Sequence, residues 1–207
     1  MDFKDLFHKY YYDTHVWSEG NTSWLGVPTL KCPLDLWIYQ EIIYETRPDW
    51  IIECGTNLGG TSLFLSSLCD LIDHGKVITI DIADNKIPKT HPRIRYLIGS
   101  STSEEIIEEL KKTIPKEDSV MVILDSDHSK NHVLKELEMY HSIVTKGNYL
   151  IVEDTNINGH PVLPEFGDGP MEALEEFLST NDEFIIDQSR EKFFLTFNPK
   201  GYLKKIK

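Results

Sequence analysis

Short apolar runs alternate with helical stretches through the middle of this 207-residue chain. The apolar runs are Trp50–Cys54, Val77–Ile82, Ile94–Ile98, Val120–Leu124 and Tyr149–Val152. Between them lie Thr61–Ile72, Glu104–Thr113 and Lys130–Ile143, which carry apolar residues at the three- and four-residue spacings of amphipathic helices. Apolar strands separated by such helices predict an α/β fold with a parallel sheet covered on both faces, and right-handed crossovers make the sheet doubly wound.

The last part of the chain departs from this alternation. After a helix predicted at Glu172–Leu178, the apolar runs Phe184–Asp187 and Phe193–Phe197 are separated by only five residues. A parallel crossover needs a longer connection, so these runs are expected to pair as an antiparallel hairpin. A mostly parallel, seven-stranded sheet that ends in such a hairpin resembles the Rossmann-like fold of class I methyltransferases.

We expect a single domain over residues 1–207, because the length suits one core and no linker-like stretch interrupts it. Residues 1–46 are predicted to form an N-terminal cap or lid on a core of residues 47–207, and they end in a helix at Pro33–Thr46. Residues 1–30 are rich in aromatics and expected to be irregular. Their aromatic side chains, among them Tyr12 and Trp17, are expected to pack on the core rather than to stack on a ligand.

Charge and hydropathy limit the partners of this chain. The net charge is −13 and no long basic run is present, which argues against a nucleic-acid substrate. No apolar run approaches the roughly 18 residues of a membrane span, and the N-terminus lacks the apolar core of a signal peptide. The three cysteines form no closely spaced pair. We therefore predict a cytoplasmic protein with reduced thiols and no membrane partner, and a homo-oligomer is possible.

A glycine-rich turn follows the first predicted strand, in the segment Glu53–Ser62. Glycines allow a close backbone approach to a ligand, but their spacing is not the GxGxxG that cradles a pyrophosphate. The acid Glu53 would suit a positively charged amino-acid moiety and oppose a pyrophosphate. The second strand ends at Asp81, 21 residues past Gly60, where nucleotide-binding sheets place a ribose-binding carboxylate. A generic strand-to-helix turn is the alternative interpretation.

The third strand leads into Gly99-Ser100-Ser101-Thr102. Its small donors could line an adenine pocket, and Thr102 or Ser103 could equally cap the helix that follows. Both interpretations can hold together.

Acidic residues follow the fourth and fifth predicted strands. The fourth strand runs into Asp125-Ser126-Asp127-His128, and the fifth into Glu153-Asp154. Oxygen ligands without thiols suit hard cations such as Mg²⁺ or Mn²⁺. The sequence therefore predicts a metal site at the sheet edge that also carries the cofactor loop, with either Asp125 or Asp127 as a ligand. His132 and His141 are interpreted as ordinary helix-surface residues.

Asp125 with Glu153-Asp154, 28 residues further on, resembles the metal site of catechol O-methyltransferase-type enzymes. The wider pattern is more similar to the cephalosporin hydroxylase and rhamnosyl O-methyltransferase family, and it spans the chain from Trp24 to about Leu178. The matching segments are Trp24-Leu25-Gly26, Lys31-Cys32-Pro33-Leu34-Asp35-Leu36-Trp37, Gln40-Glu41, Arg47-Pro48-Asp49, Ile52-Glu53-Cys54-Gly55-Thr56, Leu124-Asp125-Ser126-Asp127-His128-Ser129, Val152-Glu153-Asp154-Thr155 and Gly169-Pro170-Met171-Glu172-Ala173.

This resemblance implies an enzyme that uses S-adenosylmethionine and a Mg²⁺-type ion to methylate a hydroxyl, on a sugar or another small molecule. It assigns the metal to Asp125, Glu153 and Asp154, and the role of general base to His128. It implies that Glu53, Gly55, Asp81 and Ser101 contact the cofactor and that Lys31 lies near it. Asn57, Thr61, Ser100 and Asp125 are further residues that we expect at the cofactor site.

Two other functions are compatible with parts of the pattern. A metal-dependent hydroxylase or oxygenase would need two histidines and a carboxylate, and the sequence offers no convincing second histidine, although His160 lies in the next loop. A non-catalytic cofactor-binding protein would have little use for a metal cluster. The identity of the methyl acceptor cannot be deduced from the sequence.

Overall fold

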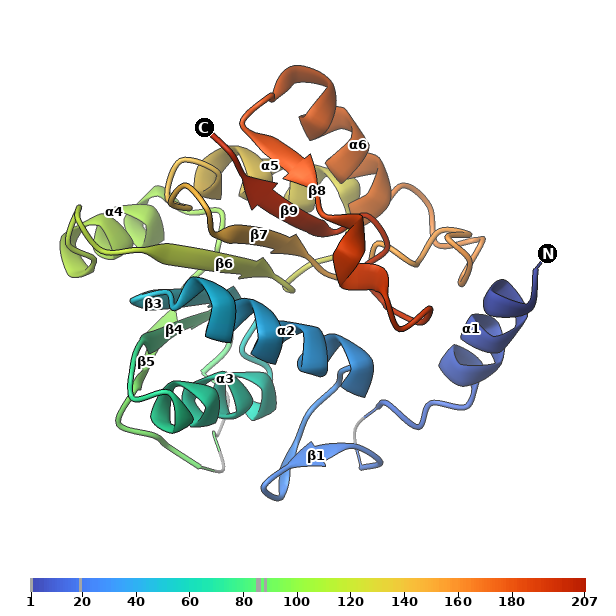
Figure 1. The fold of residues 1–207 in the computed structure, drawn as a ribbon, viewed down its shortest axis with the longest axis horizontal. Helices are drawn as coiled ribbons and strands as arrows, with labels where there is room; N and C mark the ends of the chain where they lie inside the picture. The colour runs from blue at the N-terminus through green and yellow to red at the C-terminus, as the bar shows by residue number, and fades with distance from the viewer. Residues whose placement is uncertain (1, 19, 85–86, 88) are drawn as a thin grey trace.

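A central sheet organises the molecule (Figure 1). The computed structural model describes residues 2–207 except 19, 85, 86 and 88. Within these residues the sheet has seven strands in the order β5-β4-β3-β6-β7-β9-β8. The first five along the chain are parallel, and β9 lies antiparallel between β7 and β8. The strands are β3 (Trp50–Cys54), β4 (Lys76–Asp81), β5 (Ile94–Ile98), β6 (Val120–Leu124), β7 (Tyr149–Val152), β8 (Phe184–Ile186) and β9 (Tyr202–Lys205).

Helices cover both faces of the sheet, as the apolar strands require. On one face α2 (Pro33–Thr46) and α3 (Gly60–Leu71) pack through side chains such as Ile42 and Leu65. On the other face lie α4 (Glu104–Thr113), α5 (Lys130–Tyr140) and α6 (Pro170–Thr180), with Leu137 and Leu174 fully buried. The predicted doubly wound fold is confirmed, with helix and strand ends shifted by a few residues.

The C-terminal hairpin is present, but its second strand lies elsewhere than predicted. Phe184–Ile186 pairs with Tyr202–Lys205, whereas Phe193–Phe197 forms no strand. A short 3-10 helix, η1 (Gln188–Glu191), precedes this segment, and Phe194 has a φ of +68°. The backbone N–H of Phe197 donates to the Asp35 carboxylate at 2.8 Å, so a side chain takes a bond that a strand would give to its neighbour.

The N-terminal segment is more ordered than the sequence suggested. It forms α1 (Phe3–Asp13), which Asp2 caps by accepting from the N–H of Asp5 at 2.9 Å, and a small ribbon of β1 (Ser23–Trp24) with β2 (Val27–Pro28). Part of this segment packs on Phe197, whereas α2 belongs to the layer on the sheet. Residues 1–46, which were predicted to form one cap, therefore belong to two structurally different parts.

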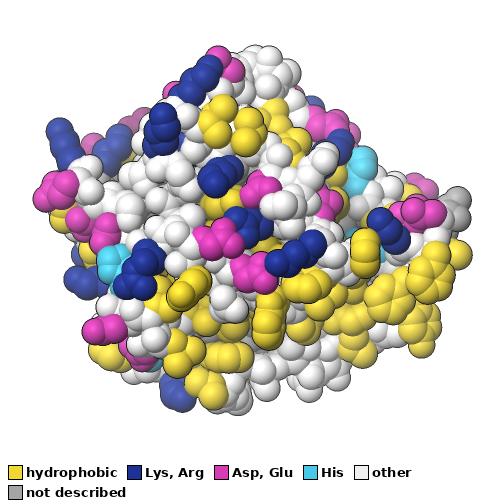
Figure 2. Space-filling model, viewed as in Figure 1, with side chains coloured by type: hydrophobic (Ala, Val, Ile, Leu, Met, Phe, Trp, Pro, Cys, Tyr) yellow, Lys and Arg dark blue, Asp and Glu magenta, His cyan; other side chains and the backbone are white. Residues whose placement is uncertain are grey.

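One face of α1 is exposed and apolar. Phe3, Leu6 and Tyr10 are exposed to solvent, and Figure 2 shows hydrophobic side chains gathered at the end of the molecule where α1 lies. In the described part of the chain, no helix combines the length and the apolar character needed to cross a bilayer. Cys32, Cys54 and Cys69 are buried and unbridged, as predicted.

Candidate active site

A cavity of about 720 Å³ opens at the carboxyl ends of the parallel strands, where ligands bind in open α/β sheets. Most of the residues predicted for the site line this cavity. They are Gly55 and Asn57 after β3, Asp81 at the end of β4, Ser100 and Ser101 after β5, Asp125 and His128 after β6, and Asp154 after β7. The topology thus brings together side chains that lie up to about 100 residues apart in sequence.

Gly55 sets how closely the first loop approaches the fourth strand. Its φ is +101°, and a Cβ there would lie 1.9 Å from the backbone oxygen of Asp125. Its N–H donates to the carbonyl of Ile80 at 2.8 Å, which continues the pairing past the end of β3. Any larger residue would push the loop away from Asp125, so glycine is required for the shape of the cavity wall.

Asp81 organises the loops on the cofactor side. One carboxylate oxygen accepts from the N–H of Asn57 at 2.8 Å, and the other from the N–H of Ala83 at 2.9 Å. Both oxygens keep further lone pairs, and the residue lines the cavity. This geometry suits a carboxylate that receives two vicinal hydroxyls.

Glu53, Thr61 and Lys31, which were predicted for the cofactor site, do not line the cavity. Glu53 is buried, and one of its oxygens accepts from the hydroxyls of Ser62 and Thr79. Its other oxygen has no partner among the described residues. Burial raises the pKa of Glu53 to about 7. In this structure Glu53 lies behind the loop, and its direct contact with a cofactor stays a prediction.

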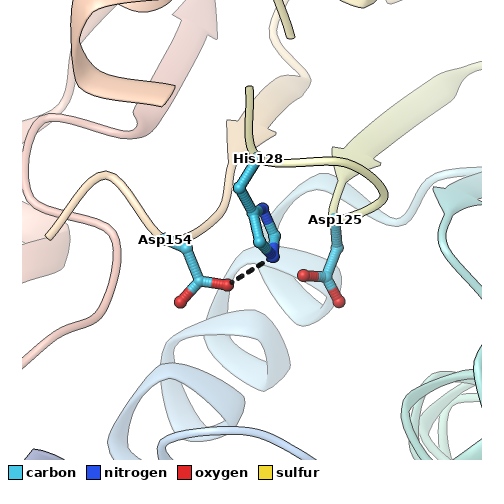
Figure 3. Close-up of side chains that lie close together, drawn as sticks. All are labelled: Asp125, His128 and Asp154. Carbon is cyan, nitrogen blue, oxygen red and sulfur yellow. Dashed lines mark ion pairs between the residues drawn. The ribbon is translucent and has the colours of Figure 1, made fainter. Parts of the chain in front are cut away.

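Asp125, His128 and Asp154 converge on one point of the cavity (Figure 3). One ligand atom from each lies within 4.8 Å of the others, and His128 Nε2 is 3.3 Å from Asp154 Oδ2. Asp127 is turned to the start of α5, where its carboxylate accepts from the N–H of Ser129 at 2.8 Å. Of the two aspartates considered as ligands, the geometry favours Asp125.

Glu153 is not part of this group of three and does not line the cavity. Its Oε1 lies 2.8 Å from the ammonium of Lys31 and accepts the hydroxyl proton of Tyr39. The same ammonium lies 2.5 Å from Asp125 Oδ2. Lys31 therefore bridges two of the three predicted metal ligands from behind the cavity, with only 4% of its side chain exposed.

Burial dominates the electrostatics of these acids. It raises the pKa of Asp125, Asp154 and Glu153 above the usual range, while Lys31 works against the rise in each. Burial also works to lower the pKa of Lys31, but the neighbouring carboxylates outweigh it and hold that pKa above its usual range. With every carboxylate ionised and His128 neutral, the three acids and the Lys31 ammonium would sum to a charge of −2, and the raised pKa values show that burial opposes this state.

The structure adds residues that sequence reasoning missed. His132, interpreted as a helix-surface residue, lines the cavity and bonds to Ser101 and Ser126, so that interpretation was wrong. Tyr12 and Trp17 pack on Phe197, as expected, and also line the cavity. The loop after β7 contributes Leu163 and Phe166. These residues belong to no recognisable motif, so they could not be predicted from the sequence.

The group of three does not resemble an oxygenase site. Such a site needs two histidines, and among the described residues the group that could hold a metal includes only His128. His160 is engaged elsewhere, with Nε2 2.9 Å from the Glu172 carboxylate.

A parallel sheet with β9 inserted antiparallel between β7 and β8, and with acids at its strand ends, defines a class I methyltransferase. The model of the family Rhamnosyl O-methyltransferase/CmcI matches residues 15–206. The chain belongs to this family. The rhamnosyl O-methyltransferase of Mycobacterium leprae is 40% identical over 205 residues, covering 95% of this chain and 88% of the relative. That of Mycobacterium tuberculosis H37Rv is 39% identical over 209 residues, covering 95% and 82%.

Solved structures agree on the fold. A CmcI structure with Mg and SAM has a TM-score of 0.69 and 21% identity, covering 90% of this chain and 77% of its own. An O-methyltransferase from Bacillus cereus in complex with SAH has a TM-score of 0.57 and 14% identity, covering 74% and 71%. The predicted family, fold and methyltransferase activity are thereby confirmed.

Proposed function

We propose that this protein transfers the methyl group of S-adenosylmethionine to a sugar hydroxyl, assisted by a Mg²⁺-class ion. The curated relatives are named for a rhamnosyl acceptor, and the CmcI structure was solved with Mg and SAM. The observation that carries the proposal is the convergence of Asp125, His128 and Asp154 on one point of the cavity, with ligand atoms within 4.8 Å of one another. In their ionised form, Asp125, Glu153 and Asp154 with Lys31 would sum to a charge of −2, which one divalent cation would balance.

Asp125 and Asp154 are the oxygen ligands that the cavity offers, because both carboxylates face it. Hard cations prefer such oxygens and keep several waters. Glu153 could join them only if Lys31 moved away from it, so its predicted role as a ligand stays a prediction. When bound, the ion supplies Lewis-acid stabilisation for a hydroxyl that loses its proton.

His128 is proposed as the general base. Asp154 lies 3.3 Å from Nε2 and orients the imidazole, and 32% of the His128 side chain is exposed, which leaves it accessible to an acceptor. The imidazole would take the hydroxyl proton as the oxygen attacks the methyl carbon. Positioning of the two reactants supplies much of the rate enhancement in such an in-line displacement.

The two ends of the cavity suit two different ligands. Asp81 and the serines after β5 lie on the side proposed for the nucleoside of the cofactor, with Asp81 on the ribose. Tyr12, Trp17, Leu163 and Phe166 line the remainder. Aromatic rings pack well on the apolar face of a sugar ring, which supports a glycosidic acceptor. The net charge of −13 supports a small acceptor over a nucleic acid.

We also propose that the enzyme acts in the cytoplasm, where S-adenosylmethionine would be supplied, and that it self-associates through an apolar surface such as that of α1.

Transfer of labelled methyl from S-adenosylmethionine to rhamnosyl glycosides tests the proposal. Label should enter the sugar with Mg²⁺ and disappear with excess chelator, and dioxygen should not be consumed. Full transfer in chelator would overturn the metal assignment, and transfer to nitrogen or carbon acceptors alone would overturn the reaction.

A further inference from the structure

A buried histidine fastens α1 to the rest of the protein, and the proposed reaction does not use it. Within α1 only His8 and Tyr12 are buried. His8 Nε2 lies 3.0 Å from the side-chain nitrogen of Asn156, and the His8 ring stacks on Phe197 with centroids 5.8 Å apart. An amide nitrogen only donates, so Nε2 accepts this hydrogen bond. Burial lowers the pKa of His8 to about 4, so the imidazole is neutral near pH 7, as this bond requires.

Asn156 is the point at which α1 meets the loop after β7. Asn156 is fully buried, and its N–H donates to the carbonyl of Phe197 at 3.1 Å. Its own carbonyl accepts from the N–H of Val162 at 3.0 Å, in the loop that carries Leu163 to the cavity. Its side-chain Oδ1 has no hydrogen-bond partner among the described residues, so the amide group depends on His8.

The position of α1 determines where two aromatic rings of the cavity wall lie. Tyr12 follows His8 by one turn of α1, and its ring centroid is 5.3 Å from that of Phe197. The Trp17 ring is 5.2 Å from Phe197, and its Nε1 donates to the carbonyl of Tyr12 at 2.9 Å. Both rings line the cavity. Because Trp17 is bonded to the last turn of α1, a displacement of α1 would move both rings together.

Docking is also what keeps α1 helical. A helix of 11 residues is marginal in water without tertiary contacts, and α1 leaves Phe3 and Tyr10 exposed on its outer side. Figure 1 shows α1 at one end of the molecule, outside the layers that cover the sheet. We propose that His8 and Asn156 are positioning residues, whose hydrogen bond keeps α1 docked so that Tyr12 and Trp17 can bind the sugar acceptor.

This inference rests on the proposed function, since it places the sugar against these two rings. If the sugar contacts them only when α1 is docked, then binding and docking must favour each other. Amide hydrogen exchange of residues 3–13, followed by mass spectrometry, reports docking without any turnover. In protein saturated with S-adenosylhomocysteine, saturating methyl α-L-rhamnopyranoside should slow this exchange by about fivefold or more, the low end of coupling between two sites.

His8→Phe is the decisive variant, because it keeps a ring on Phe197 but removes the acceptor from the buried Asn156 amide. Exchange in α1 should become roughly 5- to 150-fold faster, the range for leaving a buried donor without its partner. The KM for the rhamnoside should rise as the docked fraction falls, whereas kcat at saturating rhamnoside should stay within about twofold. The dissociation constant of S-adenosylhomocysteine should not change.

His74→Phe is the matched control. It makes the same replacement at a histidine whose Nε2 lies 2.9 Å from the carbonyl of Arg47 and which does not line the cavity. Exchange in α1 and the KM for the rhamnoside should both match those of the wild type.

Asn156→Asp tests the contact by reversing its direction. The new carboxylate can only accept, so His8 must donate from Nε2 and α1 should stay docked. An opposite charge at this distance should raise the pKa of His8, which NMR titration measures. The nearest charge now is Asp5 on α1 itself, which already opposes the effect of burial. An unchanged pKa of His8 would show that the two side chains do not pair.

The outcomes separate the two hypotheses. Exchange in His8→Phe equal to that of the wild type overturns the role of His8, and the proposed function stands. Methylation of the rhamnoside without any protection of α1 overturns the link between docking and the acceptor, again with the function intact. Failure of the wild type to methylate rhamnosyl glycosides overturns the proposed acceptor and the inference about it. If His8→Phe does not fold, the His8 pKa in Asn156→Asp decides.

Discussion

The ammonium of Lys31 lies 2.5 Å from Asp125 Oδ2, and it reaches this carboxylate from the buried side of the active-site wall. Lys31 precedes α2, whereas Asp125 follows β6, so the contact ties the N-terminal segment to the sheet. The ammonium also contacts Glu153 at 2.8 Å. It is therefore the protein's own counter-charge for the acids proposed to bind the metal.

Replacing Lys31 by methionine should destabilise the metal-free protein strongly. The change keeps much of the side-chain volume but leaves the buried Glu153 and the half-buried Asp125 without their cation, and removing one partner of a buried pair costs roughly 3–5 kcal/mol. Mg²⁺ should restore part of this loss, because it supplies positive charge to the same cluster. Urea unfolding with and without Mg²⁺ measures both effects.

Lys192→Met is the control for this experiment. Lys192 pairs with Glu41 on the surface, with 46% of its side chain exposed, and exposed ion pairs contribute at most about 1 kcal/mol. The stability of the Lys192→Met variant should be close to that of the wild type and independent of Mg²⁺. A Lys31→Met variant as stable as the control would show that Lys31 does not balance the cluster.

Glu53 should make the stability of the protein depend on pH. Burial raises its pKa in the folded protein to about 7, above the ordinary value of 4.5 expected when the chain is unfolded. The folded state therefore holds this proton more tightly, and the associated stability is present below pH 4.5 and lost as pH rises through 7. The loss is of order 3 kcal/mol at most.

Urea unfolding at several pH values between 4.5 and 8 measures this effect. The free energy of unfolding of Glu53→Gln, which cannot ionise, should fall less over this range than that of the wild type. Parallel curves for the two proteins would mean that Glu53 does not titrate there.

Metal binding should distinguish the two aspartates between which the sequence could not decide. Asp125→Asn should weaken Mg²⁺ or Mn²⁺ binding by more than the roughly 10- to 100-fold typical of an outer-shell partner, because it removes a direct ligand. Asp127→Asn should change it little, since that carboxylate is bonded to the turn before α5. Titration calorimetry compares them, and equal losses would refute the assignment of Asp125 alone.

The centre of the sheet could be predicted because strands such as β6 and β7 are apolar on both faces, and such runs stand out from amphipathic helices. The acids at strand ends were predictable for a related reason: parallel strands end at one edge. The last strand was misplaced because Tyr202–Lys205 is short and carries two lysines. Lys205 reaches the carbonyl of His141 at 2.8 Å while its stem is buried, which no local pattern reveals.

Contacts between distant segments explain the rest of what the sequence could not provide. His132 has the helical spacing of a surface residue, and only its place beside Ser101 and Ser126 brings it to the cavity. The sequence likewise does not reveal that the neighbouring residues Glu153 and Asp154 have different surroundings. Both residues lie past the end of β7, in a turn where Asp154 has a φ of +54°. There Asp154 lines the cavity, whereas Glu153 contacts Lys31.

Asp81→Ala should weaken cofactor binding. Removing charge-assisted hydrogen bonds to a ribose costs about 1.5–3 kcal/mol, or about 10- to 150-fold in the dissociation constant. Asp81 also holds the N–H groups of Asn57 and Ala83, so Asp81→Asn, which can keep one of these bonds, should lose less. Calorimetry with S-adenosylhomocysteine measures both variants, and unchanged affinity in Asp81→Ala would place the ribose elsewhere.

His128→Ala should lower kcat by roughly 10²–10⁴, the usual contribution of a positioned general base. Cofactor affinity should hardly change, because His128 stands beside Asp154 in the group proposed to bind the metal. Only neutral imidazole accepts a proton, so the wild-type rate should rise with pH and then level off. Measured kcat against pH, at saturating Mg²⁺, gives this profile.

The pH profile of His128→Ala decides whether the imidazole or the bound ion activates the acceptor hydroxyl. A hydroxyl acidified by the bound ion could produce a similar rise in rate, but it would keep that rise after His128 is replaced. If the imidazole is the base, the inflection disappears in His128→Ala while metal affinity, measured separately, stays within the range of the wild type. A variant with wild-type kcat and an unchanged profile would leave His128 as a residue that orients Asp154, with the ion alone activating the acceptor.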